Sequence, residues 1–170
     1  LNMNILINHQ LWKFVVHPSL IGGVDIEHNW LNRKYFVTGK SFFSKIDGSK
    51  TAISRLQRSS RHLYQREDAD HLDFNTELMS LKGWGGEING GKRSGKFQID
   101  VMLDWRSPGV DFNDMGYMKQ ADYIKQHFGV LYQINKPNGI FLNYYFNIDQ
   151  RHLWSFGGEN LKDELDGHLK

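Results

Sequence analysis

The chain has 170 residues, a length typical of one domain, and its 21 basic and 19 acidic residues nearly cancel, which argues against a nucleic-acid partner. It contains no cysteine, so a disulfide framework and a thiolate site are excluded. A mean hydropathy of −0.56, without any apolar run near the roughly 18 residues that a spanning helix needs, excludes a helical membrane protein.

The first third of the chain predicts four strands and one helix. Two strands are expected within the first 20 residues, where Leu1, Met3 and Ile5 alternate with asparagines and an apolar cluster at 12–16 precedes a proline. Strands at 23–30 and 35–46 follow, joined by the tight polar turn 31–34. A long connection then reaches about residue 77. Within it, the spacing of apolar and basic side chains over 51–65 predicts a short amphipathic helix.

The clearest strand pattern lies in the next hairpin, with strands expected at 78–91 and 96–106. Apolar and polar side chains alternate in the second strand, and only Met102 breaks the pattern. Such alternation gives one apolar face and one charged face. The apolar set is Phe97, Ile99, Val101, Leu103 and Trp105. Five glycines crowd 83–91, which is typical of a curved strand.

The last third predicts a further hairpin between two long connections. The first connection covers 107–120, with a turn of helix expected around 114–123. Strands at 121–134 and 139–155 then meet through the turn Asn135–Asn138, where proline and asparagine are common turn formers. A third long connection is expected to start near Gly157.

The order of the connections indicates a membrane barrel. Short and long connections alternate along the chain. All short turns are therefore expected at one end of the meander and all long loops at the other. Strand runs of about 9 to 11 residues suit a tilted crossing of the hydrocarbon layer. We therefore expect an all-β protein: an antiparallel up-and-down meander, part of a transmembrane β-barrel, with short helices in the long loops and outer-membrane lipid as its surroundings.

Three separated motifs resemble one family. They are Ile53–Arg61 continuing through Tyr64–His71, Gly90–Lys96, and Arg106–Met118 with Ala121–Tyr123. In this order they are similar to the DUF5916 domain, and the resemblance covers roughly residues 20 to 165. It implies a barrel domain of Gram-negative envelope proteins, preceded in the family by a module of the family 9 carbohydrate-binding type. It implies no catalytic residues, because the family has no established chemistry.

Candidate ligand-binding residues lie in two long loops and on aromatic strand positions: Arg55, Arg58, Arg61, Trp84, Asp111, Asn113, Asp114 and Tyr145. The acidic loop residues could hold calcium, or they could form loop-to-loop hydrogen bonds with arginines, Arg66 included. The exposed aromatics could stack on sugar rings or form an interface girdle. The eight scattered histidines lack the spacing of a metal site, so we expect neither a metal nor another cofactor.

Residues 1–170 are expected to form a single barrel segment of a longer protein in the bacterial outer membrane, with residues 1–20 the least defined part. The expected role is non-enzymatic: binding or passing an extracellular ligand such as a glycan, with other envelope proteins as further partners. One alternative is a soluble all-β domain that binds carbohydrate or hydrolyses glycosides, since strand carboxylates are plentiful. Another is a structural component of an envelope complex.

Overall fold

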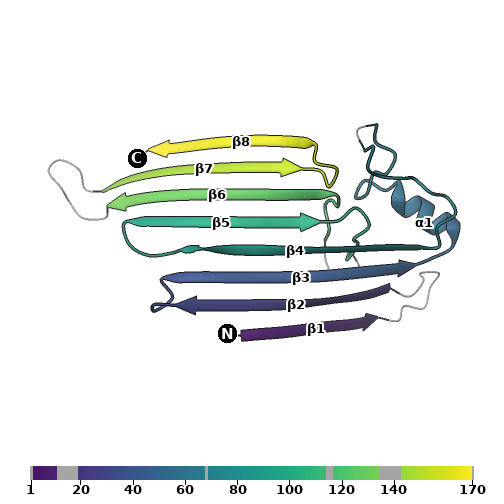
Figure 1. The fold of residues 1–170 in the computed structure, drawn as a ribbon, viewed down its shortest axis with the longest axis horizontal. Helices are drawn as coiled ribbons and strands as arrows, with labels where there is room; N and C mark the ends of the chain where they lie inside the picture. Colours follow the sequence, from purple (N-terminus) through teal and green to yellow (C-terminus); the bar gives the residue numbers. More distant parts are fainter. Residues whose placement is uncertain (1, 11–18, 68, 114–116, 135–142, 170) are drawn as a thin grey trace.

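Eight antiparallel strands lie side by side in chain order in one sheet, as the computed structural model shows (Figure 1). The structure describes residues 2–10, 19–67, 69–113, 117–134 and 143–169. The strands are β1 (Asn2–Gln10), β2 (Ser19–Trp30), β3 (Tyr35–Asp47), β4 (Ser80–Lys92), β5 (Phe97–Arg106), β6 (Tyr123–Ile134), β7 (Tyr144–Trp154) and β8 (Asn160–Leu169), with one helix, α1 (Lys50–Gln57). The predicted all-β antiparallel meander is confirmed. The sheet is not closed, and β1 and β8 are its two edges.

The connections separate the sheet into two ends. The strands β2, β4 and β6 end at one side of the sheet, which we call the turn end, and β3, β5 and β7 end at the other, the loop end (Figure 1). The turn after β2 is tight: Leu31, Asn32 and Arg33 all have positive φ angles, between 50° and 62°. The expected turn Asn135–Asn138 and the first residues of the expected strand 139–155 lie outside the described residues.

The helix prediction is confirmed in part. Helix α1 covers the first half of the expected range 51–65 and begins at Ser49, whose Oγ accepts a hydrogen bond from the Ala52 amide at 3.3 Å. It ends at Arg58, and the chain then turns through Leu63, whose φ is 47°. The second expected helix, around 114–123, is wrong over its described part, because residues 117–122 are not helical. This stretch leaves the helix path because its polar groups bind other loops.

The third long connection is also wrong. Residues 155–159 form a tight turn in which the Ser155 amide donates to the Glu159 carbonyl at 2.9 Å and Gly158 has a φ of 88°. The chain returns at once as β8. This strand is polar along most of its length, with leucines only at 161, 165 and 169 and charged residues on both faces, so a two-residue alternation of apolar and polar residues does not mark it.

The two faces of the sheet differ in chemistry. Residues that pair across the ladder share a face, so Val37, Gly90, Val101 and Phe128 form one row across four strands. On β2 to β8 every strongly exposed large apolar side chain within a strand lies on this face, which we call the apolar face. The opposite face, the polar face, carries most of the charged strand residues.

A small cluster of buried apolar residues lies at the loop end. Val110, Met118 and Ala121 are buried together, with Phe42 and Phe112 packed against them. Because Phe42 projects from the polar face of β3, this core forms where the connection 107–122 folds back over that face. Within the described residues, no helix has the length and apolar character needed to cross a bilayer.

Candidate functional site

The connection 107–122 is fixed to the polar face by hydrogen bonds at its start. Ser107 donates its amide to the Trp84 carbonyl at 2.9 Å, and its Oγ accepts from the Trp84 amide at 2.8 Å. Four residues on, the Asp111 amide donates to Ser44 Oγ at 2.8 Å. Ser44 is buried on β3, so the loop is held against two neighbouring strands.

Two glycines allow this close approach. A Cβ at Gly83 would lie 2.0 Å from the Val110 nitrogen, and one at Gly109 would lie 2.1 Å from the Lys82 carbonyl oxygen. Both distances are far inside van der Waals contact, so the loop backbone rests directly on β4. Gly83 is one of the five glycines from which we expected a curved strand. It also leaves the space in which the loop backbone packs against β4.

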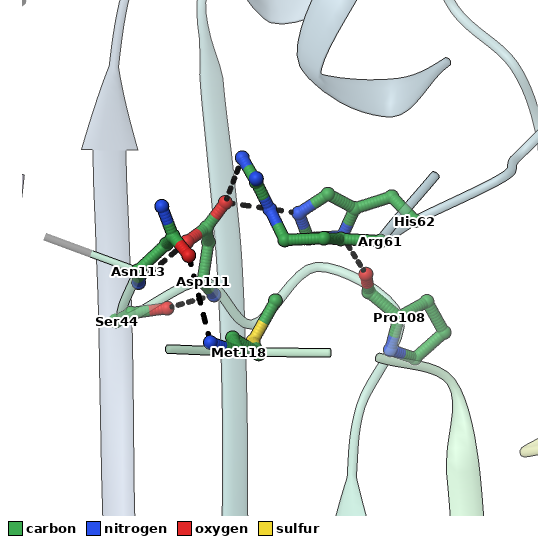
Figure 2. A network of polar contacts seen from close by, with 7 residues as sticks. All are labelled: Ser44, Arg61, His62, Pro108, Asp111, Asn113 and Met118. Atoms are coloured by element: carbon green, nitrogen blue, oxygen red, sulfur yellow. Dashed lines mark hydrogen bonds and ion pairs between the residues drawn. The ribbon is translucent and has the colours of Figure 1, made fainter. Parts of the chain in front are cut away.

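Figure 2 shows the polar contacts that close the loop, centred on Asp111. The His62 side chain is fully buried, with Nε2 3.1 Å from Asp111 Oδ2 and Nδ1 2.7 Å from the Pro108 carbonyl oxygen. Arg61 Nη2 lies 3.6 Å from the same carboxylate oxygen. Both partners of His62 are acceptors, and a neutral imidazole has only one N–H, so the doubly protonated ring is the form that donates to both.

The second oxygen of Asp111 organises the rest of the loop. Oδ1 accepts from the Asn113 amide at 2.9 Å, and Asn113 Oδ1 accepts in turn from the Met118 amide at 3.5 Å (Figure 2). Burial alone would raise the pKa of Asp111. The hydrogen bonds from His62 and Asn113, with the positive charges of His62 and Arg61, outweigh burial and hold the pKa of this carboxyl below its usual value.

A second buried carboxylate, Asp122, joins three described connections at the loop end. Its side chain is 0% exposed, and Oδ2 lies 2.5 Å from Arg66 Nη2. Oδ1 lies 2.9 Å from His71 Nε2 and accepts from the Phe156 amide at 3.1 Å. Burial of the Tyr64 hydroxyl and, as the smaller cause, the nearby charge of Asp122 raise the pKa of Tyr64 to about 12. Because these partners come from 48–79 and 155–159, Asp122 ties both connections to 107–122.

The predicted site residues do not form one site. Arg61, Asp111 and Asn113 meet in the cluster of Figure 2, and Asp114 lies outside the described residues. Arg55 and Arg58 are exposed, and the Arg58 guanidinium lies 4.5 Å from the Phe74 ring centre.

The side chains of the two predicted aromatic residues lie outside that cluster. Trp84 is 54% exposed on the apolar face, in edge contact with Trp105 and Phe156. Tyr145 lies near the turn end on the polar face, where its ring contacts His168. Neither aromatic can share a ligand with the loop cluster.

The loop-to-loop alternative is confirmed for two arginines, since Arg61 pairs with Asp111 and Arg66 with Asp122. In the part of the chain that the structure describes, no group of three or more histidines and carboxylates is arranged to hold a metal ion. Asp122 is one of the acidic loop residues that the sequence offers as partners for the arginines, and the structure places it with Arg66. Sequence reasoning missed His62 and His71 as partners of the two carboxylates. The signal for His62 is its place directly after Arg61, at the end of a family motif.

The strand part of the polar face carries a further histidine. His127 of β6 places Nε2 2.9 Å from Asp149 Oδ1 on β7 and Nδ1 3.5 Å from Asp100 Oδ2 on β5. A Cβ at Gly129 would lie 2.9 Å from Asp149 Oδ1, so glycine there leaves room for the contact. The middle of this face therefore consists of paired charges rather than an apolar core.

One protein family accounts for these motifs. Its model, described as a domain of unknown function (DUF5916), matches residues 31–164, which include both buried carboxylates and all their partners. No curated protein and no solved structure is significantly similar to the chain. The chain belongs to the DUF5916 family.

Proposed function

We propose that this chain is a wall segment of a bacterial outer-membrane β-barrel. The apolar face meets lipid, the polar face lines the interior, and the loop end lies outside the cell. The barrel binds or passes a ligand that arrives at the loop end, a glycan being the candidate that the family's companion module favours.

The observation that carries the proposal is the exposed apolar face. A soluble sheet covers its apolar face with a second layer, because water-exposed apolar area is unfavourable. Here Val101 is 43% exposed in the middle of β5, and the described loops pack over the opposite face. Polar residues do enter the apolar face: Gln150 pairs with Phe128 in the row of Val101, and the others lie nearer the strand ends, among them Lys45, Asp47, Lys82, Lys92, Gln126, His152 and Asp163.

Aromatic residues border this face at both ends. The turn-end group is Trp30, Tyr35, Phe97, Tyr132 and Phe146, and the loop-end group is Phe43, Trp84, Trp105 and Trp154. Aliphatic side chains such as Ile88, Val101 and Ile148 lie between the groups. Along β5 the eight residue steps from Phe97 to Trp105 cover about 26 Å. Barrel proteins have an apolar band of about 25 Å between two aromatic girdles.

The polar face suits a hydrated interior. Its charges are paired along the strands, as at His127 and Asp149, and the loop 107–122 covers only its loop end. In a barrel this loop would narrow the outer mouth. The buried clamps at Asp111 and Asp122 would then hold the mouth in one shape.

A matched pair of substitutions tests which face meets lipid. Val101→Arg should lower the free energy of unfolding by about 2–4 kcal/mol in phospholipid bilayers, because an arginine at mid-membrane must face hydrocarbon. Met102→Arg, one residue further along β5, should cost far less. Its side chain joins the polar face, between Asp100 and Asp104. Folding titrations in lipid vesicles measure both values.

Equal losses for the two variants would show that both faces meet the same surroundings and would contradict the membrane assignment. A protein that stays monomeric without detergent and melts cooperatively would instead support the soluble all-β domain.

A further inference from the structure

We infer that the polar face holds a binding site for small organic anions with two or more negatively charged oxygen groups, such as sulfated or uronate-bearing saccharides. The site is an open cavity of about 490 Å³ at the loop end of β6, β7 and β8. This inference names the ligand class for the binding part of the proposed function. It rests on the polar face being open to solutes and not on what covers the apolar face.

The strand register gathers the cationic side chains. Lys125 of β6 pairs with Leu153 of β7, which pairs with Lys162 of β8, so these three form one row across the cavity. Arg151 lies two residues from Leu153 on the same face, in the next row toward the turn end. Leu153 between the lysines gives the row an apolar centre against which a sugar ring can pack.

The loop 107–122 supplies one more cation. Lys119 lines the cavity from above the strands, and the loop that carries it is held by the contacts of Asp111 and Asp122. Its backbone position is therefore set by the clamps and not by a ligand. The cavity is thus preformed, a property that lowers the entropy cost of binding.

The charge balance of the lining favours anions. Four cationic side chains, Lys119, Lys125, Arg151 and Lys162, face one carboxylate, Glu164, which gives +4 − 1 = +3. Glu164 contacts Lys162 and lies 3.7 Å from Arg151, and Asp166 lies 3.1 Å from Arg151. These contacts neutralise part of the β7 and β8 charge.

The remaining two cations are free for a ligand. Among the described residues, the ammonium group of neither Lys119 nor Lys125 has a hydrogen bond or ion pair to another protein group. Asp104 pairs with Lys125 in the β5–β6 ladder, but its carboxylate accepts from the Tyr123 hydroxyl at 2.8 Å and lies 3.9 Å from Arg106 Nε. The ammonium groups of Lys119 and Lys125 are therefore uncompensated, and Arg151 in the same cavity is only partly neutralised. This arrangement suits a ligand that carries two or more separated negative groups.

Calorimetric titration of the full chain folded in detergent micelles tests the site. The probes are a disulfated disaccharide, a diuronate, pyrophosphate and neutral maltose. We expect binding of the sulfated and uronate sugars and none of maltose, with affinity falling as salt concentration rises. The double variant Lys119→Gln and Lys125→Gln should weaken binding by about tenfold or more. Lys40→Gln, on the same face of β3 but outside the cavity, is the matched control and should leave affinity unchanged.

Any other outcome overturns the inference, and the outcomes can be distinguished from one another. Equal weakening by Lys40→Gln would mean diffuse attraction to the polar face. Binding of pyrophosphate but not of the sugars would assign the cavity to phosphates, and binding of maltose would remove the role of charge. A protein that binds none of the probes yet inserts normally into vesicles would refute the anion site while leaving the membrane assignment intact.

Discussion

At the scale of single residues, the loop end depends on two carboxylates buried away from water. A buried charge is tolerated only when it is paired and hydrogen-bonded. Asp111 and Asp122 each meet this condition through an arginine, a histidine and a backbone amide. Removing either carboxylate would leave cationic donors buried without a partner, which costs more than the net gain from the pair itself.

Asp111→Asn is therefore expected to lower the free energy of unfolding at pH 7 by about 1–3 kcal/mol, the usual cost of a buried donor left unsatisfied. Because the folded pKa of Asp111 lies below its usual value, the carboxylate stabilises the fold above its unfolded pKa of about 4. That stabilisation is lost as pH falls through the folded pKa. The difference between wild type and variant should thus shrink toward pH 3.

Urea titrations in detergent at several pH values measure this difference. Asp47→Asn is the control, because Asp47 pairs with Lys45 at 2.7 Å in a solvent-exposed position and should contribute under about 1 kcal/mol. If the difference in unfolding free energy between wild type and Asp111→Asn did not change with pH, the charge of Asp111 would not be what stabilises the loop end.

At the scale of elements, the connection 107–122 and strand β4 act as one packed unit. The strand carries glycine where the loop backbone touches it, and the loop carries glycine where it touches the strand. The unit places Lys119 over β6 to β8 and covers the loop end of the polar face. Its local stability therefore decides both the shape of the cavity and the width of the mouth in the proposed barrel.

Gly83→Ala should displace this loop. The added Cβ would lie 2.0 Å from the Val110 backbone nitrogen, so the backbone has to move. We expect a loss of about 1–3 kcal/mol, as for other overpacked sites, and faster amide hydrogen exchange over 107–122. Gly39→Ala on β3 is the control, since a Cβ there has no neighbour within 4 Å. Unchanged exchange over 107–122 in Gly83→Ala would mean that the loop does not rest on β4 in solution.

At the scale of the whole molecule, the sheet has one apolar face, one charged face and two unpaired edges. Edge strands attract other strands unless they are covered, and an exposed apolar face attracts lipid or protein. In the proposed barrel both demands are met together, because closure removes the edges and the bilayer covers the apolar face.

The proposed orientation can be tested on intact cells that carry single cysteines, since the native chain has none. A cysteine at Asn113, in the loop end, should react with a membrane-impermeant maleimide, and one at Ser94, in the turn after β4, should not. Both positions are exposed in the fold, so shielding by protein does not distinguish them. Labelling at Ser94 with protection at Asn113 would reverse the orientation.

Sequence alternation predicted the central strands well, because a two-residue period is set by backbone geometry alone. It failed for β8, where charged residues occupy both faces, and around 114–123, where long-range hydrogen bonds determine the loop path. The site was predicted only in part for a similar reason. His62 and Asp111 are 49 positions apart, and no local sequence pattern indicates that their two loops are in contact. The arginines and carboxylates were correctly identified as loop partners, but their specific pairing requires the fold.

The interlocked loops also decide where the chain tolerates added sequence. Surface loops usually accept insertions because few contacts hold them. Here the connections 48–79, 107–122 and 155–159 meet at buried Asp122, through the ion pair to Arg66 and the hydrogen bond from the Phe156 amide, so lengthening one of them would disturb the other two. The turn Arg93–Lys96 is exposed and contains Gly95 at a φ of 95°. It is therefore the position at which an epitope tag or a reporter domain is best accommodated, and evolutionary length variation should concentrate at the turn end and not at the loops.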